Sequence, residues 1–128
     1  MAYTDIKTQI YTVINTVCSG KASLYQREAK STAIFPYVVF KLNQIESTNY
    51  HEDWFSLDID LYCKGDTTVI DNLMTSLNTN LNGFYYASDT NSKEFFRVYK
   101  RSMGENVNDE SGIYRNTMRF LVKSQSLT

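Results

Sequence analysis

Cysteine, proline and histidine are scarce in this sequence, with two cysteines, one proline and one histidine among 128 residues. Two cysteines are too few for a disulfide framework, so we expect Cys18 and Cys63 to be reduced, buried thiols. The only histidine is His51, which lies in a polar stretch, so a Ser-His-Asp or Cys-His arrangement has a single candidate base. These shortages argue against a disulfide-stapled domain and against histidine-dependent catalysis.

Long apolar runs and an excess of charge are absent too. No run approaches the roughly 20 apolar residues that span a bilayer. The N-terminal sequence MAYTDIK lacks the basic region and apolar core of a signal peptide. We therefore expect no membrane partner and synthesis in the cytoplasm. Thirteen basic and fourteen acidic residues give a net charge of -1, which argues against bulk attraction to nucleic acid.

Aromatic residues are abundant, with ten Tyr, seven Phe and one Trp. Tyrosine suits surfaces that are partly wet and partly covered, which favours an interface. It is equally common in strands, so a β-rich domain explains the count as well. A chain of this length is sufficient for one domain with its own core, and we assign residues 1–128 to a single domain.

The clearest pattern runs from Trp54 to Lys64. Apolar residues alternate there with polar ones, which predicts a strand with one apolar and one acidic face. Gly65 ends it, and Asp66 is a suitable N-cap for a helix that follows at once. We interpret this segment as a central strand of an antiparallel sheet.

Two helices are predicted from apolar stripes at helical spacing. The first covers about residues 5–18, with Thr4 as its cap and Ser19-Gly20 as its stop. The second follows Asp66 and ends near residue 82, where Gly83 is well placed as a C-terminal stop.

Alternation and turn residues predict the remaining elements. Strands are expected over 35–44, 84–86, 94–101 and 114–123, with turns or loops over 45–53, 89–92 and 103–112. The inward face of 94–101 stays undecided. A meander with both helices on one face satisfies every apolar stripe. The fold class is therefore α+β, a two-layer domain with a mainly antiparallel sheet and two helices packed on one face.

Catalytic and metal-binding patterns are weak. His51, Glu52 and Asp53 are consecutive, so their side chains do not converge easily on one ion. Asp58 and Asp60 share a strand face and form a candidate acid–base pair, although a solvated strand face explains them as well. No phosphate-binding loop of the G-x-x-x-x-G-K or G-x-G-x-x-G type occurs. We expect no cofactor, and an assembly protein rather than an enzyme.

Charged side chains suggest where contacts are made. The polar face of 114–123 is basic, so Arg115 and Arg119 are expected to pair with Asp58 and Asp60 if the two strands are neighbours. Two polar segments are further candidates, because long unstructured connections are often functional, although a solvated loop remains the alternative. The arm over 21–34 contributes Lys21, Tyr25, Arg27 and Lys30. The loop over 103–112 contributes Glu105, Asp109 and Glu110.

The order of these segments resembles the tail completion (tail terminator, head-to-tail joining) proteins of long-tailed bacteriophages. An N-terminal helix leads through a variable loop to FPYVVF, then WFSLDIDLY, a helix reading IDNLMTSLN, and a closing strand IYRNTMRFLVK. The resemblance spans roughly residues 5–124 and rests on the arrangement rather than on one diagnostic motif.

This resemblance implies a non-enzymatic virion component at the tail–head junction. Six copies are expected to close into a ring that caps the tail tube and docks to the head connector protein, with DNA only passing through the channel. A closed ring needs a heterologous contact, in which one patch of a copy meets a different patch of the next. The candidates for this contact are the two long loops and the charged strands, through Asp58, Asp60, Arg115 and Arg119, with pairing of these four residues inside one copy as the alternative. A monomer that assembles only on the tail tip fits as well.

A different phage neck or baseplate adaptor is one alternative, which shares the fold arguments and differs only in its partner. Another is a small-molecule-binding or enzymatic α+β domain with a pocket between sheet and helices. Trp54, Phe55, Phe95 and Tyr99 are its expected lining, with Asp58 or Asp60 as the polar group.

Overall fold

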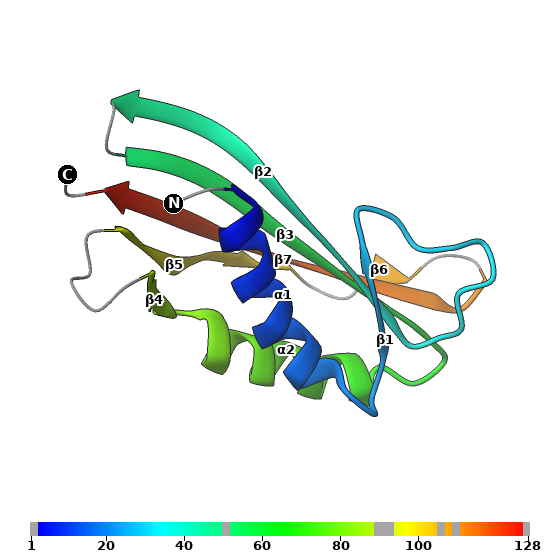
Figure 1. The fold of residues 1–128 in the computed structure, drawn as a ribbon. Coiled ribbons are helices and arrows are strands. Elements are labelled where there is room, and N and C mark those ends of the chain that lie inside the picture. Colours follow the sequence, from blue (N-terminus) through cyan, green and yellow to red (C-terminus); the bar gives the residue numbers. More distant parts are fainter. Residues whose placement is uncertain (1–2, 50–51, 89–93, 105–106, 109–110, 127–128) are drawn as a thin grey trace.

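A computed structural model describes residues 3–49, 52–88, 94–104, 107–108 and 111–126 (Figure 1). The described residues form two helices and seven strands. The helices are α1 (Tyr3–Cys18) and α2 (Thr68–Leu81). The strands are β1 (Ser23–Gln26), β2 (Tyr37–Asn49), β3 (Glu52–Lys64), β4 (Tyr85–Ala87), β5 (Glu94–Met103), β6 (Val107–Asn108) and β7 (Ile113–Ser126).

The strands form one sheet in the order β1-β2-β3-β7-β5-β4, with β6 also paired to β7. All pairs are antiparallel except β1 with β2, so the sheet is mainly antiparallel as predicted. The predicted central strand is confirmed, because β3 lies between β2 and β7. The predicted meander is wrong, since β7 inserts between β3 and β5 and the α2 crossover carries the chain to the far edge.

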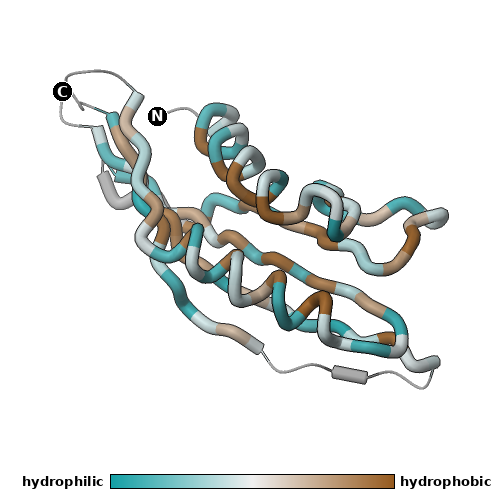
Figure 2. The backbone as a smooth tube through the Cα atoms, turned by 90° about the horizontal axis from the view of Figure 1, so that it is seen from below, coloured by the Kyte–Doolittle hydropathy of each residue, from teal (hydrophilic) through white to brown (hydrophobic). Residues whose placement is uncertain are grey.

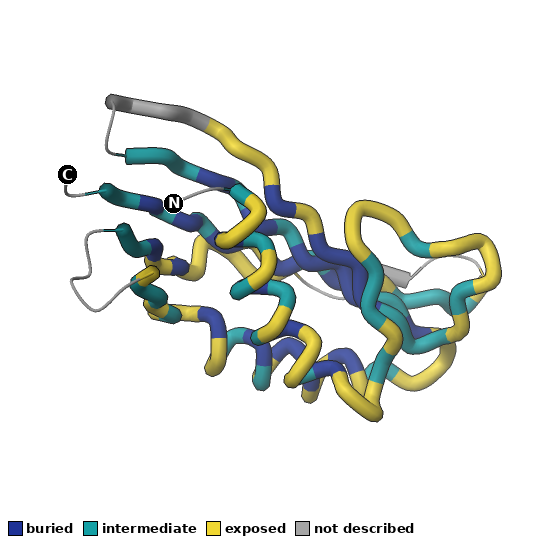
Figure 3. The backbone as a smooth tube through the Cα atoms, viewed as in Figure 1, coloured by how far each residue is buried: buried dark blue, intermediate teal, exposed yellow. Residues whose placement is uncertain are grey.

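Both helices cover the same face of the sheet, which confirms the two-layer α+β prediction (Figures 1 and 2). Alternate residues of the long strands point into the space between the layers, and the buried residues gather there (Figure 3). Phe40, Leu57, Ile59 and Phe120 meet α1 and α2 residues such as Ile10 in one core. The inward face of β5 is now settled, because Phe96 and Val98 are buried.

Two expected connections turn out to be partly strand. Within the 21–34 arm, residues 23–26 form β1, since Leu24 packs against the core while Tyr25 points to the other side. A strand of four residues is too short for its alternation of inward and outward side chains to be recognised in the sequence. Of the expected turn over 45–53, residues 45–49 continue β2 and residues 52–53 belong to β3, with register shifts between Gln44 and Glu46 and between Ser47 and Asn49. These residues are polar because this end of the hairpin projects beyond the helices (Figure 1).

The predicted helix ends are close to the observed ones. The helix α1 starts at Tyr3, so Thr4 lies inside it and is not its cap. The N-cap of α2 is Thr67 and not Asp66 as predicted. Asp66, one residue earlier, still accepts hydrogen bonds from the Thr68 amide at 2.9 Å and the Thr68 hydroxyl at 2.7 Å. These two bonds lower the pKa of Asp66 below its usual value, and the bond from the Thr68 hydroxyl is the larger cause. Gly20 and Gly83 end the helices with φ of +73° and +84°, as predicted.

Several predicted features lie wholly or partly outside the described residues. These are His51, the turn over 89–92, and the loop residues Glu105, Asp109 and Glu110. In the rest of that loop, Met103 ends β5, and Val107–Asn108 pairs with β7 as β6.

Candidate interaction surface

The second face of the sheet carries no helix in the described part of the chain (Figure 1). We call it the open face. Register and alternation place on it residues whose neighbours along each strand are buried in the core. They are Tyr37, Val39, Lys41, Trp54, Ser56, Asp58, Asp60, Tyr62, Phe95, Arg97, Tyr99, Arg115, Thr117, Arg119, Leu121 and Lys123.

The predicted charge pairs between β3 and β7 are present on this face. Arg115 approaches Asp60 Oδ1 at 3.3 Å, and Arg119 Nε lies 3.8 Å from Asp58 Oδ1. Thr117 also donates its hydroxyl to Asp60 at 2.6 Å. Asp60 is only 7% exposed, so the predicted wet acidic face is wrong at this position. Both aspartates of β3 on the open face are therefore paired with arginines of β7 in the same copy.

A third polar cluster on the open face was not predicted. Lys123 Nζ lies 3.6 Å from Glu52 and 5.2 Å from the centre of the Trp54 ring. The Trp54 indole also donates to Glu52 at 2.8 Å. The three residues belong to neighbouring strands, so only the register between β3 and β7 brings them together. The pattern along a single strand does not show which residues of two strands lie opposite one another, so this cluster could not be predicted from it.

Aromatic rings border the charge pairs at the β1 end of the open face. Tyr37 stacks on Tyr62 at 4.7 Å, and Tyr25 meets Tyr37 edge-on at 6.1 Å. Arg115 lies 5.9 Å from the Tyr62 ring centre. Burial raises the pKa of Tyr62, the Asp60 charge raises it further, and Arg115 lowers it. Both the Tyr37 and Tyr62 hydroxyls therefore remain protonated at neutral pH, since burial also raises the pKa of Tyr37.

The sequence contained one usable signal for these tyrosines. Tyr37, Val39 and Lys41 alternate along β2, but the apolar Val39 makes the segment look continuously apolar and hides its outward side.

The predicted contact residues of the 21–34 arm are only partly brought together. Tyr25 joins the open face, whereas Lys21 and Lys30 are exposed in the connections before and after β1. Arg27 has φ of +67° in a tight turn closed by the Glu28 amide on Gln26 O at 2.8 Å. With Glu28 and Ala29 it overhangs a hollow of about 300 Å³ on the open face. This hollow is also lined by Tyr37, Val39, Lys41, Asp60 and Tyr62.

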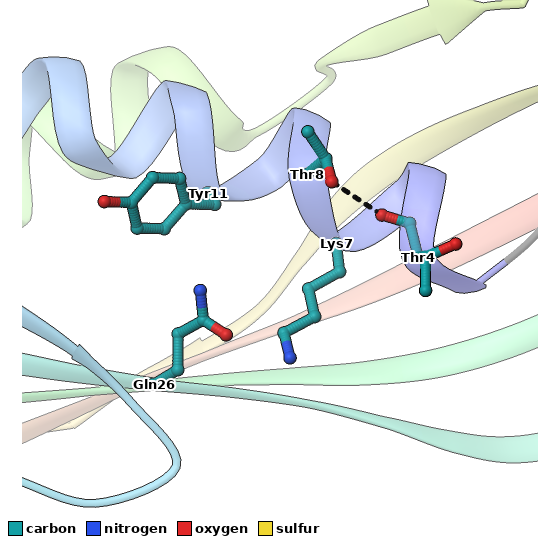
Figure 4. A pocket seen from close by; sticks show the side chains of 5 residues that line it. All are labelled: Thr4, Lys7, Thr8, Tyr11 and Gln26. Carbon is teal, nitrogen blue, oxygen red and sulfur yellow. Dashed lines mark hydrogen bonds between the residues drawn. The ribbon is translucent and has the colours of Figure 1, made fainter.

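The predicted ligand pocket is wrong in the form proposed from the sequence. Phe55 is buried under the helices, whereas Trp54 and Tyr99 lie on the open face, so they do not line one cavity. A second hollow, of about 260 Å³, lies between α1 and β1. Lys7 and Tyr11 of α1 and Gln26 of β1 border it together with two threonines (Figure 4). It contains no carboxylate for acid–base work.

Metal and membrane sites are not found in the described ranges. No group of three or more His, Cys, Asp or Glu side chains there could hold an ion. No described helix is long and apolar enough to cross a membrane. Cys18 and Cys63 are both buried free thiols, as predicted.

Comparison with known proteins places the fold but not the family. No protein-family model matches the chain, and no curated protein matches it. One similar solved structure is a chain from the virion of a native gene transfer agent particle, with a TM-score of 0.66 and 8% identity. That match covers 91% of this chain and 92% of the other. A second solved chain, which has no functional name, gives a TM-score of 0.75 at 11% identity over 98% and 96% of the two chains.

Proposed function

We propose that this protein is a structural component of a phage-like virion. The observation that carries the proposal is the likeness to a chain of a gene transfer agent virion particle over nearly the full length of both chains. Phe55 lies in the core under the helices while Trp54 and Tyr99 lie on the open face, an arrangement that fits a role in assembly better than the ligand-binding alternative.

Within the virion, the finer proposal is a tail completion protein. Six copies close into a ring that caps the tail tube and joins it to the head connector, and DNA passes through the channel. The order of segments that resembles tail completion proteins supports this role, and the described topology keeps that order.

The open face is the proposed contact between copies in the ring. Tyr, Trp and Arg are the residue types enriched in the centres of protein interfaces, and this face presents Trp54, Tyr99 and Arg97 together. Because Asp58 and Asp60 already have partners within the chain, burying the face does not leave these two carboxylates unpaired. The exposed Lys21 and Lys30 of the arm remain for the tube or the connector.

The first test is the mass of the purified protein across a concentration series, followed by negative-stain images alone and with tail tubes. A closed ring, or density capping the tube ends, is the expected result. A strict monomer that leaves tube ends bare would overturn the tail completion role.

A matched pair of variants tests the open face. Arg97 points to the open face, and Lys100 lies on the opposite side of the same strand, opposite the core residue Phe120. Arg97→Glu should prevent ring formation, whereas Lys100→Glu should leave it intact. Equal behaviour of the two variants would show that the open face is not the contact.

A further inference from the structure

The hollow under the arm is lined by two cations that form no ion pair with any described residue. These are Arg27 of the arm and Lys41 of β2, and both are exposed. We call this site the basic hollow. It is also lined by Asp60 and Glu28. Because Asp60 is bound by Arg115, only Glu28 is left to offset the two cations, and the hollow keeps an excess of positive charge.

Hydrogen-bond donors accompany these cations. The Arg27 amide donates to Phe40 O of β2 at 2.9 Å, which fixes the arm against the sheet at this point. The stacked rings of Tyr37 and Tyr62 also line the hollow. Their hydroxyls are protonated at neutral pH, because burial raises the pKa of both, and so they can donate. Cations together with donors are the groups that bind a carboxylate.

The chain itself contains a segment of the opposite charge. Residues 104–112 read GENVNDESG, with three acidic residues and no Lys or Arg. We call this segment the acidic loop. Within it, Val107–Asn108 forms β6 and pairs with β7. The acidic loop is thus attached to a defined edge of the sheet.

The basic hollow and β6 lie toward opposite edges of the sheet, at the same end of its long strands (Figure 1). Across this end, residues 23–26 of β1 pair with 37–40 of β2, these with 59–62 of β3, and these with 115–118 of β7. The strand β6 then pairs with β7 at Arg115. Three strand spacings, roughly 14 Å, therefore separate β6 from β2, with β3 and β7 between them. The two oppositely charged patches belong to opposite sides of one copy.

This placement suits a ring of identical copies. In a closed ring, one patch of each copy meets a different patch of the next. A twofold dimer through the hollow would instead place cations against cations, which is unfavourable. Nucleic acid is a poorer match than the acidic loop, because its regularly spaced phosphates need a row of cations and the hollow has two beside an acid.

We propose that the basic hollow of one copy receives the acidic loop of the next copy. Glu105, Asp109 and Glu110 supply the carboxylates, and Arg27 and Lys41 bind them. This inference rests on the proposed ring and names the two patches that form the charged part of the contact between its copies. The hollow belongs to the open face, so the loop extends that contact to the β1 end of the sheet.

Reversing the charge of each patch separately tests the contact. The hollow variant carries Arg27→Glu with Lys41→Glu, and the loop variant carries Glu105→Lys, Asp109→Lys and Glu110→Lys. Either variant alone brings like charges together, so the protein concentration at half-assembly should rise about a hundredfold. Light scattering measures it in solution, and negative-stain images of tube ends measure it if assembly needs the tube.

An equimolar mixture of the two variants tests whether the contact joins different copies. In a ring of six that alternates them, the acidic hollow of one variant meets the basic loop of the other. At every second contact, an unchanged hollow meets an unchanged loop. The mixture should therefore form rings of wild-type mass at the wild-type concentration, within about threefold. A contact inside one copy would not be rescued by mixing, because each variant keeps its like charges in one chain.

A matched control separates this contact from a general effect of charge. Lys7→Glu with Lys100→Glu changes the net charge as much as the hollow variant does, at two positions outside both patches. It should assemble like wild type. Thermal unfolding of every variant shows that the chains are folded.

The outcomes separate this inference from the proposed function. If wild-type protein forms no ring, alone or on tube ends, the proposed function fails and this inference fails with it. If wild type and both charge-reversed variants form rings equally well, the inference fails and the proposed function stands. If both folded variants lose the ring and the mixture does not regain it, the two patches do not meet, which also overturns the inference.

Discussion

The open face and the outward side of the two helices are both polar, yet their side chains are held in different ways. We call the outward side of the helices the hydroxyl face, after its exposed threonines Thr8, Thr12, Thr16, Thr75 and Thr79. On the open face, Asp60 accepts from Thr117 and Arg115 of a neighbouring strand, so partners far apart in sequence are joined. On the hydroxyl face, Thr12 bonds only to the carbonyl of Thr8 in its own helix. Strand pairing brings distant residues opposite one another, whereas a helix offers a hydroxyl its own preceding turn.

The difference has a consequence for stability. Side chains of the open face tie β3 to β7 and therefore contribute to the tertiary structure. The threonine hydroxyls of the hydroxyl face donate to carbonyls of their own helix, so these bonds do not tie one element to another. Substitutions on the two faces should therefore change the free energy of unfolding in opposite directions.

The largest effect is expected for Asp60→Ala. It removes an acceptor that is 7% exposed and leaves the Thr117 hydroxyl without its 2.6 Å bond. We expect the free energy of unfolding in urea to fall by about 2 kcal/mol, the range for hydrogen bonds to a charged group. Asp58→Ala is the control, because its 3.8 Å pair with Arg119 should contribute less than about 0.5 kcal/mol. Equal losses would mean that burial does not separate the two pairs.

Alkaline pH should act on both layers in different windows. Burial, opposed by nearby Lys21, raises the pKa of Cys18 at the end of α1 from 9.0 to about 11. The folded protein thus keeps a proton that the unfolded chain loses, so this stabilisation is complete below pH 9 and is lost as the pH rises through about 11. The free energy of unfolding should fall by about 1 to 2 kcal/mol over that window.

Two variants assign the alkaline loss to its sources. Cys18→Ala should flatten the decrease that begins at pH 9, even if its stability at pH 7 is lower. Tyr37→Phe should affect only the decrease above pH 10, because the pKa of Tyr37 is raised from 10.0. Urea titrations at several pH values measure both, and an unchanged slope in Cys18→Ala would show that its thiol is not responsible.

The elements with a clear period were predictable from sequence, and those set by pairing were not. The alternation of Leu57, Ile59 and Leu61 depends only on local geometry, and the structure places all three in the core. The position of β7 between β3 and β5, by contrast, depends on contacts between segments far apart in the chain. The strand β1 also depends on such contacts, because its four residues are recognisable as a strand only through their pairing with β2.

The candidate surface shows the same division. The sequence predicted that Asp58 pairs with Arg119 if the two strands are neighbours. The observed register places them opposite one another. The Trp54 cluster with Glu52 and Lys123 was not, since it needs the register itself. The uncharged stretches 8–20 and 72–88 were visible in the sequence, but only the structure shows that both helices lie on one face of the sheet.

A small gain is expected for Thr12→Ala on the hydroxyl face. Threonine has a lower helix propensity than alanine, and its hydroxyl bond to the preceding turn joins no second element. The free energy of unfolding should therefore rise by about 0.3 to 0.5 kcal/mol. Calorimetry of Thr12→Ala beside wild type measures it, and Thr75→Ala on α2 is the matched repeat. A loss above about 1 kcal/mol in both variants would show that these hydroxyls stabilise the monomer.

The smallest change in folding is expected for Arg119→Ala, and it separates folding from assembly. The guanidinium lies 3.8 Å from Asp58 and its side chain is 61% exposed, so the pair should contribute less than about 0.5 kcal/mol to the monomer. If the open face joins copies of the ring, the same arginine becomes desolvated there, and the ring should dissociate at a protein concentration several-fold higher than for wild type. Light scattering over a dilution series measures that concentration. A variant that is markedly less stable but assembles normally would place Arg119 in the monomer's structure and leave the ring contact elsewhere.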